Sequence, residues 1–301
     1  MSSLIGRFQR DLPFLRQGLV PQEEGGLEVD KLKYTGEEHE KLTDEDVKNL
    51  AEALMENNQF RGELKLNSND LTDLAALYLA PIFEKQNGHN ITKLKVDGNN
   101  FTSKAGEYIG SALSSNPEYK IKKLSFQGIC LESIGLVRLM EAVNANANIK
   151  FLTIGVLTDD GLVQLAELLR ENNSLEEISI QETKDPQKLW TERGRGAFTE
   201  VLESCTSLKQ VILHFTREDE EADKAFKSEI KFYTKMKAKA EGKKKAYAKV
   251  LHSCEPTQMF DKLQELIESN DGAVHQMPVR KFYNNTFNTL LNRAMFALKK
   301  K

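Results

Sequence analysis

A short hydrophobic pattern, in which two apolar residues are separated by one other residue, recurs seven times along the 301-residue chain. The seven pairs are Leu32/Tyr34, Leu64/Leu66, Leu94/Val96, Leu124/Phe126, Leu152/Ile154, Ile178/Ile180 and Val211/Leu213. Successive pairs lie 26 to 33 residues apart, and six of them have another apolar residue three positions earlier. Arg61 takes that place in the second copy, with Phe60 beside it as a substitute. The alternation predicts a short β-strand in each copy, and the regular period predicts a repeat protein.

Helical periodicity follows these strands. Residues 43–58 place Val47, Leu50 and Leu54 on one face, with Thr43 as the expected N-cap. Comparable patterns cover 72–86, 102–115, 132–145, 158–172 and 194–205. Because one strand and one helix each bury only one face, neighbouring copies have to stack. The sequence therefore predicts a parallel sheet with helices along one side.

The third copy contains the pattern L-x-x-L-x-L-x-x-N-x-L as Ile91, Leu94, Val96, Asn99 and Phe101. The second copy matches through Leu64, Leu66, Asn69 and Leu71, and a helix with a closing Asn116 follows the third. This pattern resembles the ribonuclease-inhibitor-type leucine-rich repeat (LRR). The resemblance covers residues 27–216 and implies an α/β fold, a right-handed leucine-rich-repeat solenoid of about seven strand–helix repeats with a C-terminal α-helical extension. Where Glu37, Ile129 and Leu157 replace the asparagine, we expect wider turns.

In this type of repeat, strand alternation places the residues beside and between the apolar pair on the concave side. Six lysines fall there in the first four copies, and none in the last three: Lys31, Lys33, Lys65, Lys93, Lys95 and Lys123. One interpretation is a docking surface for an acidic segment of a partner protein. The other is an ordinary solvated sheet. Phe151, an aromatic on the same face, favours docking.

The charge changes sign along the chain. Residues 1–223 carry 25 basic and 38 acidic side chains, whereas residues 224–301 carry 17 basic and 7 acidic ones. We therefore predict three parts, an N-terminal arm (1–26), the solenoid (27–216) and a basic α-helical cap and tail (217–301), and expect the first turns of the tail to shield the last repeat. Candidate residues for a second partner are Lys243, Lys244, Lys245, Phe287, Leu291 and Phe296.

Partners of the basic tail remain open at this point. An acidic protein surface, nucleic acid and an ordinary solvated helix face all suit its charge. Nucleic acid is the weaker hypothesis, because the tail has no zinc-ligand spacing, no aromatic RNA-binding motif and no helix-turn-helix signal.

Two further features have alternative interpretations. Residues 1–20 have apolar side chains at helical spacing, which suits a targeting segment, a partner-binding arm or a cap on the first repeat. Trp190, the single tryptophan, suits either packing over the repeats or anchoring a partner.

Signals of catalysis are missing from the sequence. It contains no Walker loop, G-x-S-x-G elbow, H-E-x-x-H motif or dinucleotide fingerprint. Its three cysteines lie far apart, and no apolar run approaches the roughly 20 residues of a membrane helix. We expect no enzyme activity, no cofactor, no metal and no membrane span, and a cytoplasmic location.

The leading hypothesis is a non-catalytic scaffold or adaptor that binds other proteins within a multi-protein complex. Members of the resembled family in cilia and the cytoskeleton suggest an axonemal or cytoskeletal setting. The alternative is a regulator of a small GTPase, resembling the leucine-rich Ran activators, although those have an acidic tail and this tail is basic. An enzyme inhibitor is a third possibility, for which we expect more aromatic and acidic residues on the concave face.

Overall fold

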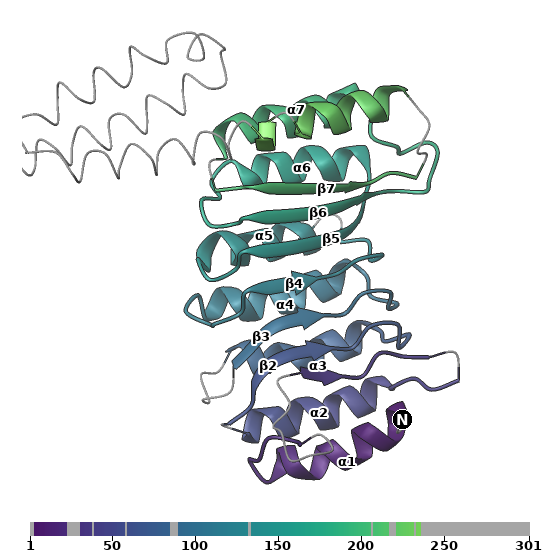
Figure 1. Cartoon of the computed structure of the whole chain (residues 1–301), viewed down its shortest axis with the longest axis vertical. Helices are drawn as coiled ribbons and strands as arrows, with labels where there is room; N and C mark the ends of the chain where they lie inside the picture. The colour runs from purple at the N-terminus through teal and green to yellow at the C-terminus, as the bar shows by residue number, and fades with distance from the viewer. Residues whose placement is uncertain are drawn as a thin grey trace, which may run out of the picture.

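Strand alternates with helix through most of the chain (Figure 1). The computed structural model describes residues 3–22, 31–37, 39–57, 59–84, 90–131, 134–205, 207–216, 221–231 and 233–235. The strands are β1 (Lys31–Lys33), β2 (Arg61–Lys65), β3 (Asn90–Lys95), β4 (Lys123–Ser125), β5 (Phe151–Leu157), β6 (Glu177–Glu182) and β7 (Gln210–His214). The helices are α1 (Leu4–Arg16), α2 (Asp44–Glu56), α3 (Asp73–Glu84), α4 (Ser103–Ser115), α5 (Ile134–Ala145), α6 (Asp159–Leu169) and α7 (Glu192–Ser204).

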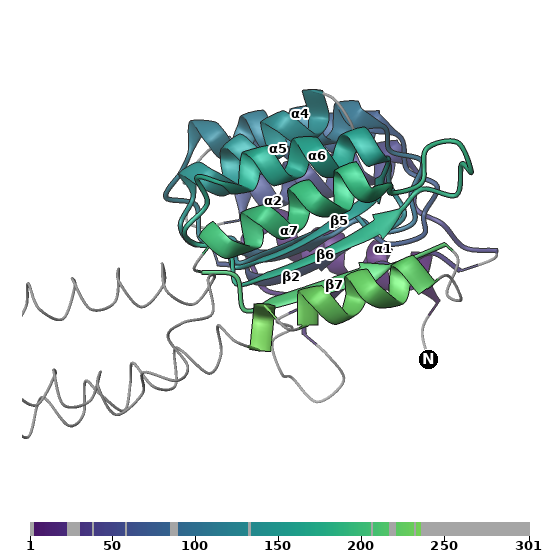
Figure 2. The same ribbon diagram turned by 90° about the horizontal axis from the view of Figure 1, so that it is seen from above.

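The strands form one parallel sheet in the order β1-β2-β3-β4-β5-β6-β7. The first members of the seven predicted apolar pairs are aligned across it, from Leu32 opposite Leu64 to Ile178 opposite Val211. Helices α2 to α7 lie along one side of the sheet (Figure 2). The α/β repeat architecture is thus confirmed. We call the other side, which carries the six lysines, the open face.

Apolar side chains fill the layer between sheet and helices. Leu64 and Leu94 are buried from the strands, and Leu50 and Leu54 from α2. Phe60 is also buried while Arg61 is exposed, so Phe60 does substitute for the missing apolar residue. At the start of α2, the Thr43 side chain accepts a hydrogen bond from the Asp46 backbone N–H, as predicted for its N-cap.

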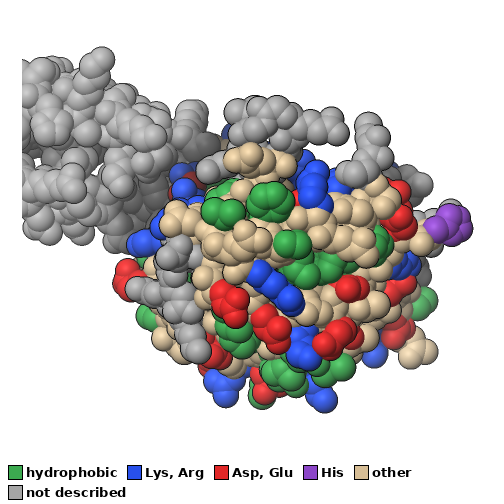
Figure 3. All heavy atoms as spheres, turned by 90° about the horizontal axis from the view of Figure 1, so that it is seen from below, with side chains coloured by type: hydrophobic (Ala, Val, Ile, Leu, Met, Phe, Trp, Pro, Cys, Tyr) green, Lys and Arg blue, Asp and Glu red, His purple; other side chains and the backbone are tan. Residues whose placement is uncertain are grey.

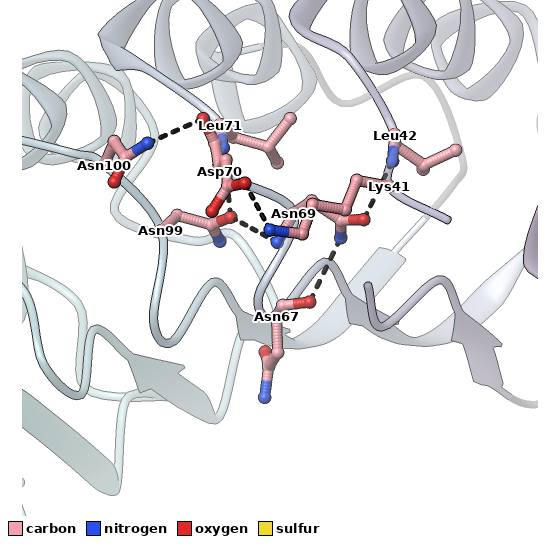
Figure 4. A network of polar contacts seen from close by, with 8 residues as sticks. All are labelled: Lys41, Leu42, Asn67, Asn69, Asp70, Leu71, Asn99 and Asn100. Atoms are coloured by element: carbon pink, nitrogen blue, oxygen red, sulfur yellow. Dashed lines mark hydrogen bonds and ion pairs between the residues drawn. The ribbon is translucent and has the colours of Figure 1, made fainter. Parts of the chain in front are cut away.

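Asparagine side chains join the turns of successive repeats (Figure 4). The Oδ1 atom of Asn69 accepts a hydrogen bond from the Leu42 N–H at 2.9 Å, and its Nδ2 atom donates to the Tyr34 carbonyl at 2.6 Å. Asn99 repeats this arrangement one unit later, since its Nδ2 atom donates to the Leu66 carbonyl at 2.9 Å. Each amide therefore satisfies buried backbone groups of the previous repeat.

The turns without this asparagine are built differently. After β4, the Ile129 carbonyl accepts the backbone N–H of Val156 at 2.8 Å, and the β5–β6 register shifts between Thr153 and Val156. Gly155 is required here, because a Cβ atom at this position would lie 1.9 Å from the Ile129 carbonyl oxygen. Backbone pairing and an irregular β5 thus replace the missing amide.

A second asparagine series closes the helices. Asn57 donates from Nδ2 to the Leu15 carbonyl at 3.0 Å and accepts the Phe60 N–H at 2.8 Å. Asn172 accepts the Leu175 N–H at 2.8 Å and donates to the side chain of Asn144 at 2.8 Å. The helix-to-strand turns are therefore tied together in the same way as the strand-to-helix turns.

Helix α1 covers the N-terminal end of the stack. The ring of Phe8 meets Tyr34 edge-on with centroids 5.5 Å apart, and the Tyr34 hydroxyl donates to the buried Asp11 at 3.0 Å. Burial and the neighbouring Asp11 raise the pKa of Tyr34. Figure 3 shows basic, acidic and hydrophobic side chains interspersed on this end. Residues 4–16 thus pack as a cap, which a repeat stack requires at its ends.

The C-terminal end is covered by the helical residues 221–231. Phe226, which is 3% exposed, has its ring centroid 6.2 Å from that of Phe215 and 6.4 Å from those of Trp190 and Phe198. Asp223 forms an ion pair with Arg195. The expected shielding of the last repeat is confirmed. The Trp190 Nε1 atom donates to the Leu157 carbonyl at 3.0 Å and the side chain is buried, so Trp190 packs within the fold.

Candidate partner-binding face

The sheet brings the six predicted lysines together on four adjacent strands. Lys31 is opposite Glu63, which is opposite Lys93, which is opposite Lys123. Two residues further along these strands, Lys33 is opposite Lys65, which is opposite Lys95. Adjacent strands lie about 4.8 Å apart, so residues up to 92 positions apart in sequence share one small area. We call this set of six residues the lysine cluster.

The lysine cluster is accessible. Lys31, Lys33 and Lys93 are exposed, and Lys65, Lys95 and Lys123 are half-buried. The three half-buried lysines can bury their aliphatic stems and keep their ammonium groups in contact with solvent, as long basic side chains commonly do. The cluster thus concentrates positive charge within a segment whose overall charge is negative.

Phe151 borders the lysine cluster on β5. It is opposite Lys123 in the sheet and half-buried, and the Lys123 Nζ atom lies 5.9 Å from its ring centroid. This distance is that of a cation–π contact. The predicted aromatic is therefore in place at the edge of the cluster, in contact with a basic side chain.

Glu63 lies within the lysine cluster and was not among the predicted site residues. It is 5% exposed, and its Oε1 atom lies 3.6 Å from Lys65 Nζ and 3.4 Å from Lys95 Nζ. Burial opposes ionisation of this carboxylate, but Lys65, Lys95 and Lys93 outweigh burial and lower the pKa of Glu63. The cluster therefore contains one negative charge among six positive ones.

Asp97 lies at the end of β3 beside the cluster. Its Oδ1 atom accepts hydrogen bonds from the Ser125 hydroxyl at 2.6 Å and from the Gln127 N–H at 2.8 Å. Its Oδ2 atom accepts from the Asn67 side chain at 3.2 Å. Asp97 is thus held by the turn after the strands, and it bounds the cluster on that side.

The other half of the open face is polar. Ser179 and His214 are its only described hydrogen-bonded pair that combines a nucleophile with a base, with 3.1 Å between Ser179 Oγ and His214 Nε2. In the Ser-His-Asp arrangement, a third group orients the histidine of such a pair. Among the described residues, no carboxylate forms a hydrogen bond with His214.

A cleft of about 990 Å³ lies on the helix side, between α5, α6 and residues 187–193. Charged side chains line it, but they pair with one another. Arg138 contacts Glu141 at 2.9 Å, and Arg193 contacts Asp160 at 2.6 Å. The cleft has no excess of either charge that points to a ligand.

Three further predictions concern the tail residues, a metal ion and a membrane-spanning helix. The tail candidates Lys243, Lys244, Lys245, Phe287, Leu291 and Phe296 lie outside the described residues. Within the described ranges, no three His, Cys, Asp or Glu side chains are grouped so that they could hold a metal ion. No helix in the described part of the chain has the length and apolar character needed to cross a membrane.

Comparisons with known proteins add little to this geometry. No protein-family model matches the chain. No curated protein sequence matches it either. Among solved structures it is similar to one titled Leiomodin-1 Actin-Binding Site 2 (ABS2), at 13% identity over 83% of this chain and 98% of that chain, with a TM-score of 0.32. The functional argument therefore rests on the geometry of the open face.

Proposed function

We propose that the chain is a non-catalytic scaffold whose lysine cluster binds an acidic segment of a protein partner. The observation that carries the proposal is the gathering of six lysines on the side of β1 to β4 that none of the described helices α2 to α7 covers. Like charges on adjacent strands repel one another and destabilise a sheet. A surface that tolerates this repulsion is well suited to an oppositely charged partner, whose approach it would accelerate.

A protein segment suits this surface better than nucleic acid. A nucleic acid extends its negative charge well beyond a four-strand patch. Residues 1–223 carry 13 more acidic than basic side chains, so the surroundings of the cluster would repel such a polyanion. A short acidic stretch of polypeptide can place its carboxylates on the lysines and continue with neutral residues. Phe151 then offers apolar contact at the edge of the cluster.

The proposal includes the finer family assignment. We infer an LRR solenoid of the ribonuclease-inhibitor type, supported by the aligned apolar pairs and the asparagine contacts of Asn69 and Asn99. The basic tail is proposed to bind a second protein. The proposed setting, an axonemal or cytoskeletal complex in the cytoplasm, rests on the family resemblance alone. Microscopy of the tagged full chain in ciliated cells tests this location.

Binding is tested with the full chain and a fluorescent hexaglutamate peptide at low salt. The background variant carries Lys243→Glu, Lys244→Glu and Lys245→Glu, so that the tail does not compete for the probe. Adding Lys33→Glu and Lys93→Glu should weaken binding by more than about tenfold. The matched control adds Lys48→Glu and Lys104→Glu on the helix side, with the same change in total charge. Equal losses in both variants would refute a specific role of the cluster.

A further inference from the structure

The lysines of the cluster differ in their nearest charged neighbour. Lys65 and Lys95 lie within 3.6 and 3.4 Å of Glu63. Within the described part of the chain, neither Lys33 nor Lys93 forms an ion pair, and both are exposed. Lys123 contacts the ring of Phe151. The cluster thus contains two lysines that already face a carboxylate, Lys65 and Lys95, and two exposed lysines, Lys33 and Lys93, that form no ion pair with the described residues.

Glu63 is fixed at the centre of the cluster. It lies on β2, opposite Lys31 on β1 and Lys93 on β3, and only 5% of it is exposed. Its Oε1 atom is buried and accepts no hydrogen bond from the described residues. The neighbouring lysines keep its pKa low, so the carboxylate is charged at neutral pH. At 3.6 and 3.4 Å, its contacts with Lys65 and Lys95 are longer than strong hydrogen bonds and are mainly electrostatic.

Building on the proposed function, we propose that Glu63 is a specificity-determining residue that acts as an internal competing anion. It faces Lys65 and Lys95 in the unbound protein. An acidic segment binds mainly through the lysines on either side of it, with Lys33 on β1 and Lys93 on β3 as the principal contacts. A partner carboxylate directly over β2 is repelled by Glu63.

This arrangement selects a spacing of acidic groups. Two strand intervals separate β1 from β3, and Lys33 lies two residues further along its strand than the partner row of Lys93, so the two positions are about 12 Å apart. A segment with carboxylates this far apart and a neutral group between them fits the cluster, whereas a continuous acidic run places a negative charge over Glu63. Without Glu63, the cluster would attract any dense anion. Its presence therefore lowers the total affinity and raises the selectivity.

The test is a double-mutant cycle in the full chain with the same tail background and the same hexaglutamate probe. Lys93→Gln and Lys95→Gln are compared, since both side chains lie on β3 and differ in their distance from Glu63. Lys93→Gln should weaken binding about fivefold. Lys95→Gln should weaken it only about twofold, because its ammonium group already faces Glu63 and contributes mainly at long range.

Glu63→Gln should strengthen binding of the probe about fivefold, and Lys95→Gln should then cost as much affinity as Lys93→Gln. Glu177→Gln is the matched control, since Glu177 lies in the same row of the sheet on β6, away from the lysine cluster. It should change affinity less than about twofold. A peptide with two glutamates about 12 Å apart should gain less from Glu63→Gln than hexaglutamate does.

The possible outcomes distinguish a failure of the proposed role of Glu63 from a failure of the proposed function of the lysine cluster. If reversal of Lys33 and Lys93 has no specific effect, the proposed function fails. The alternative is that this reversal weakens binding specifically, as the proposed function expects. In that case, only the role of Glu63 is refuted if Glu63→Gln does not strengthen binding and if Lys93→Gln and Lys95→Gln cost the same affinity. Should Glu63→Gln not fold, the comparison of Lys93→Gln with Lys95→Gln decides alone.

Discussion

The Oδ1 atom of Asn99 accepts a hydrogen bond from the backbone N–H of Asn69 at 2.8 Å, although the two residues are 30 positions apart. They are equivalent asparagines of successive repeats. Asn99 also accepts the Leu71 N–H at 3.2 Å, which repeats the bond that Asn69 accepts from the Leu42 N–H. In these two turns, one buried amide thus fixes both the shape of its own turn and the position of the previous one.

Asn99→Ala should therefore destabilise the fold. The Asn99 side chain bonds the N–H groups of Asn69 and Leu71 and the carbonyls of Leu66 and Val96. Leaving buried backbone groups unsatisfied should lower the free energy of unfolding by about 2–4 kcal/mol. Urea denaturation measures the change. Asn100→Ala is the control, because this exposed neighbour donates one bond of 3.2 Å to the Asp70 carbonyl, and it should cost under about 1 kcal/mol.

Two glycine-to-alanine substitutions should have opposite signs. Gly110 lies in α4 against α5, and a Cβ atom there would meet the Arg138 carbonyl carbon at 2.5 Å. Gly110→Ala should therefore force the helices apart and lower the free energy of unfolding by about 1–3 kcal/mol. Gly196 in α7 has no atom within 4 Å of the added Cβ position, so Gly196→Ala should stabilise by about 0.5–1 kcal/mol. Unchanged or increased stability of Gly110→Ala would contradict the close packing of α4 on α5.

Removing the aromatic contact at the C-terminal end should expose the last repeat. Phe226→Ala deletes the ring that packs on Trp190, Phe198 and Phe215, and it should destabilise by about 3–5 kcal/mol. Trp190 fluorescence should shift to the red as water reaches the indole. Lys224→Ala, on an exposed position of the same helical segment, should leave both the emission and the unfolding midpoint unchanged.

The low pKa of Glu63 makes stability depend on pH on the acidic side. The folded state holds this carboxylate ionised more strongly than the unfolded state does, because of Lys65, Lys95 and Lys93. The resulting stabilisation is complete above the ordinary glutamate pKa of about 4.3 and is lost as the pH falls through the lower folded pKa. Denaturation curves between pH 7 and pH 3 should show a shallower decline for Glu63→Gln than for the wild type. Parallel curves would contradict this assignment.

The sequence predicted the repeat well because the same hydrophobic pattern occurs in every copy. Leu32, Leu64 and Leu94 could be aligned from their spacing alone, and they are opposite one another in the sheet. The alternation also placed the six lysines correctly on one side. Each of these features depends on residues within a single repeat, where local periodicity determines which face a side chain occupies.

Contacts between repeats were harder to predict. Glu63 was placed on the face, but its importance depends on Lys95, which is 32 residues away and becomes a neighbour only in the sheet register. An alignment of the repeat sequences would have placed the Glu63 carboxylate in a column of lysines. The hydrophobic pattern also gives no signal for the irregular β5, where Gly155 approaches the Ile129 carbonyl and the register shifts. The packing of α1 also required its partner Tyr34 to be known.

The most direct test of the lysine cluster maps where an acidic peptide binds. Carbodiimide joins a carboxylate to an amine only when the two are in contact, so mass spectrometry of the full chain treated with hexaglutamate identifies the lysines involved. We predict crosslinks at Lys33, Lys93 and Lys123, with fewer at Lys95 because it faces Glu63. Crosslinks confined to helix-side lysines such as Lys104, or to Lys243, Lys244 and Lys245, would contradict the account.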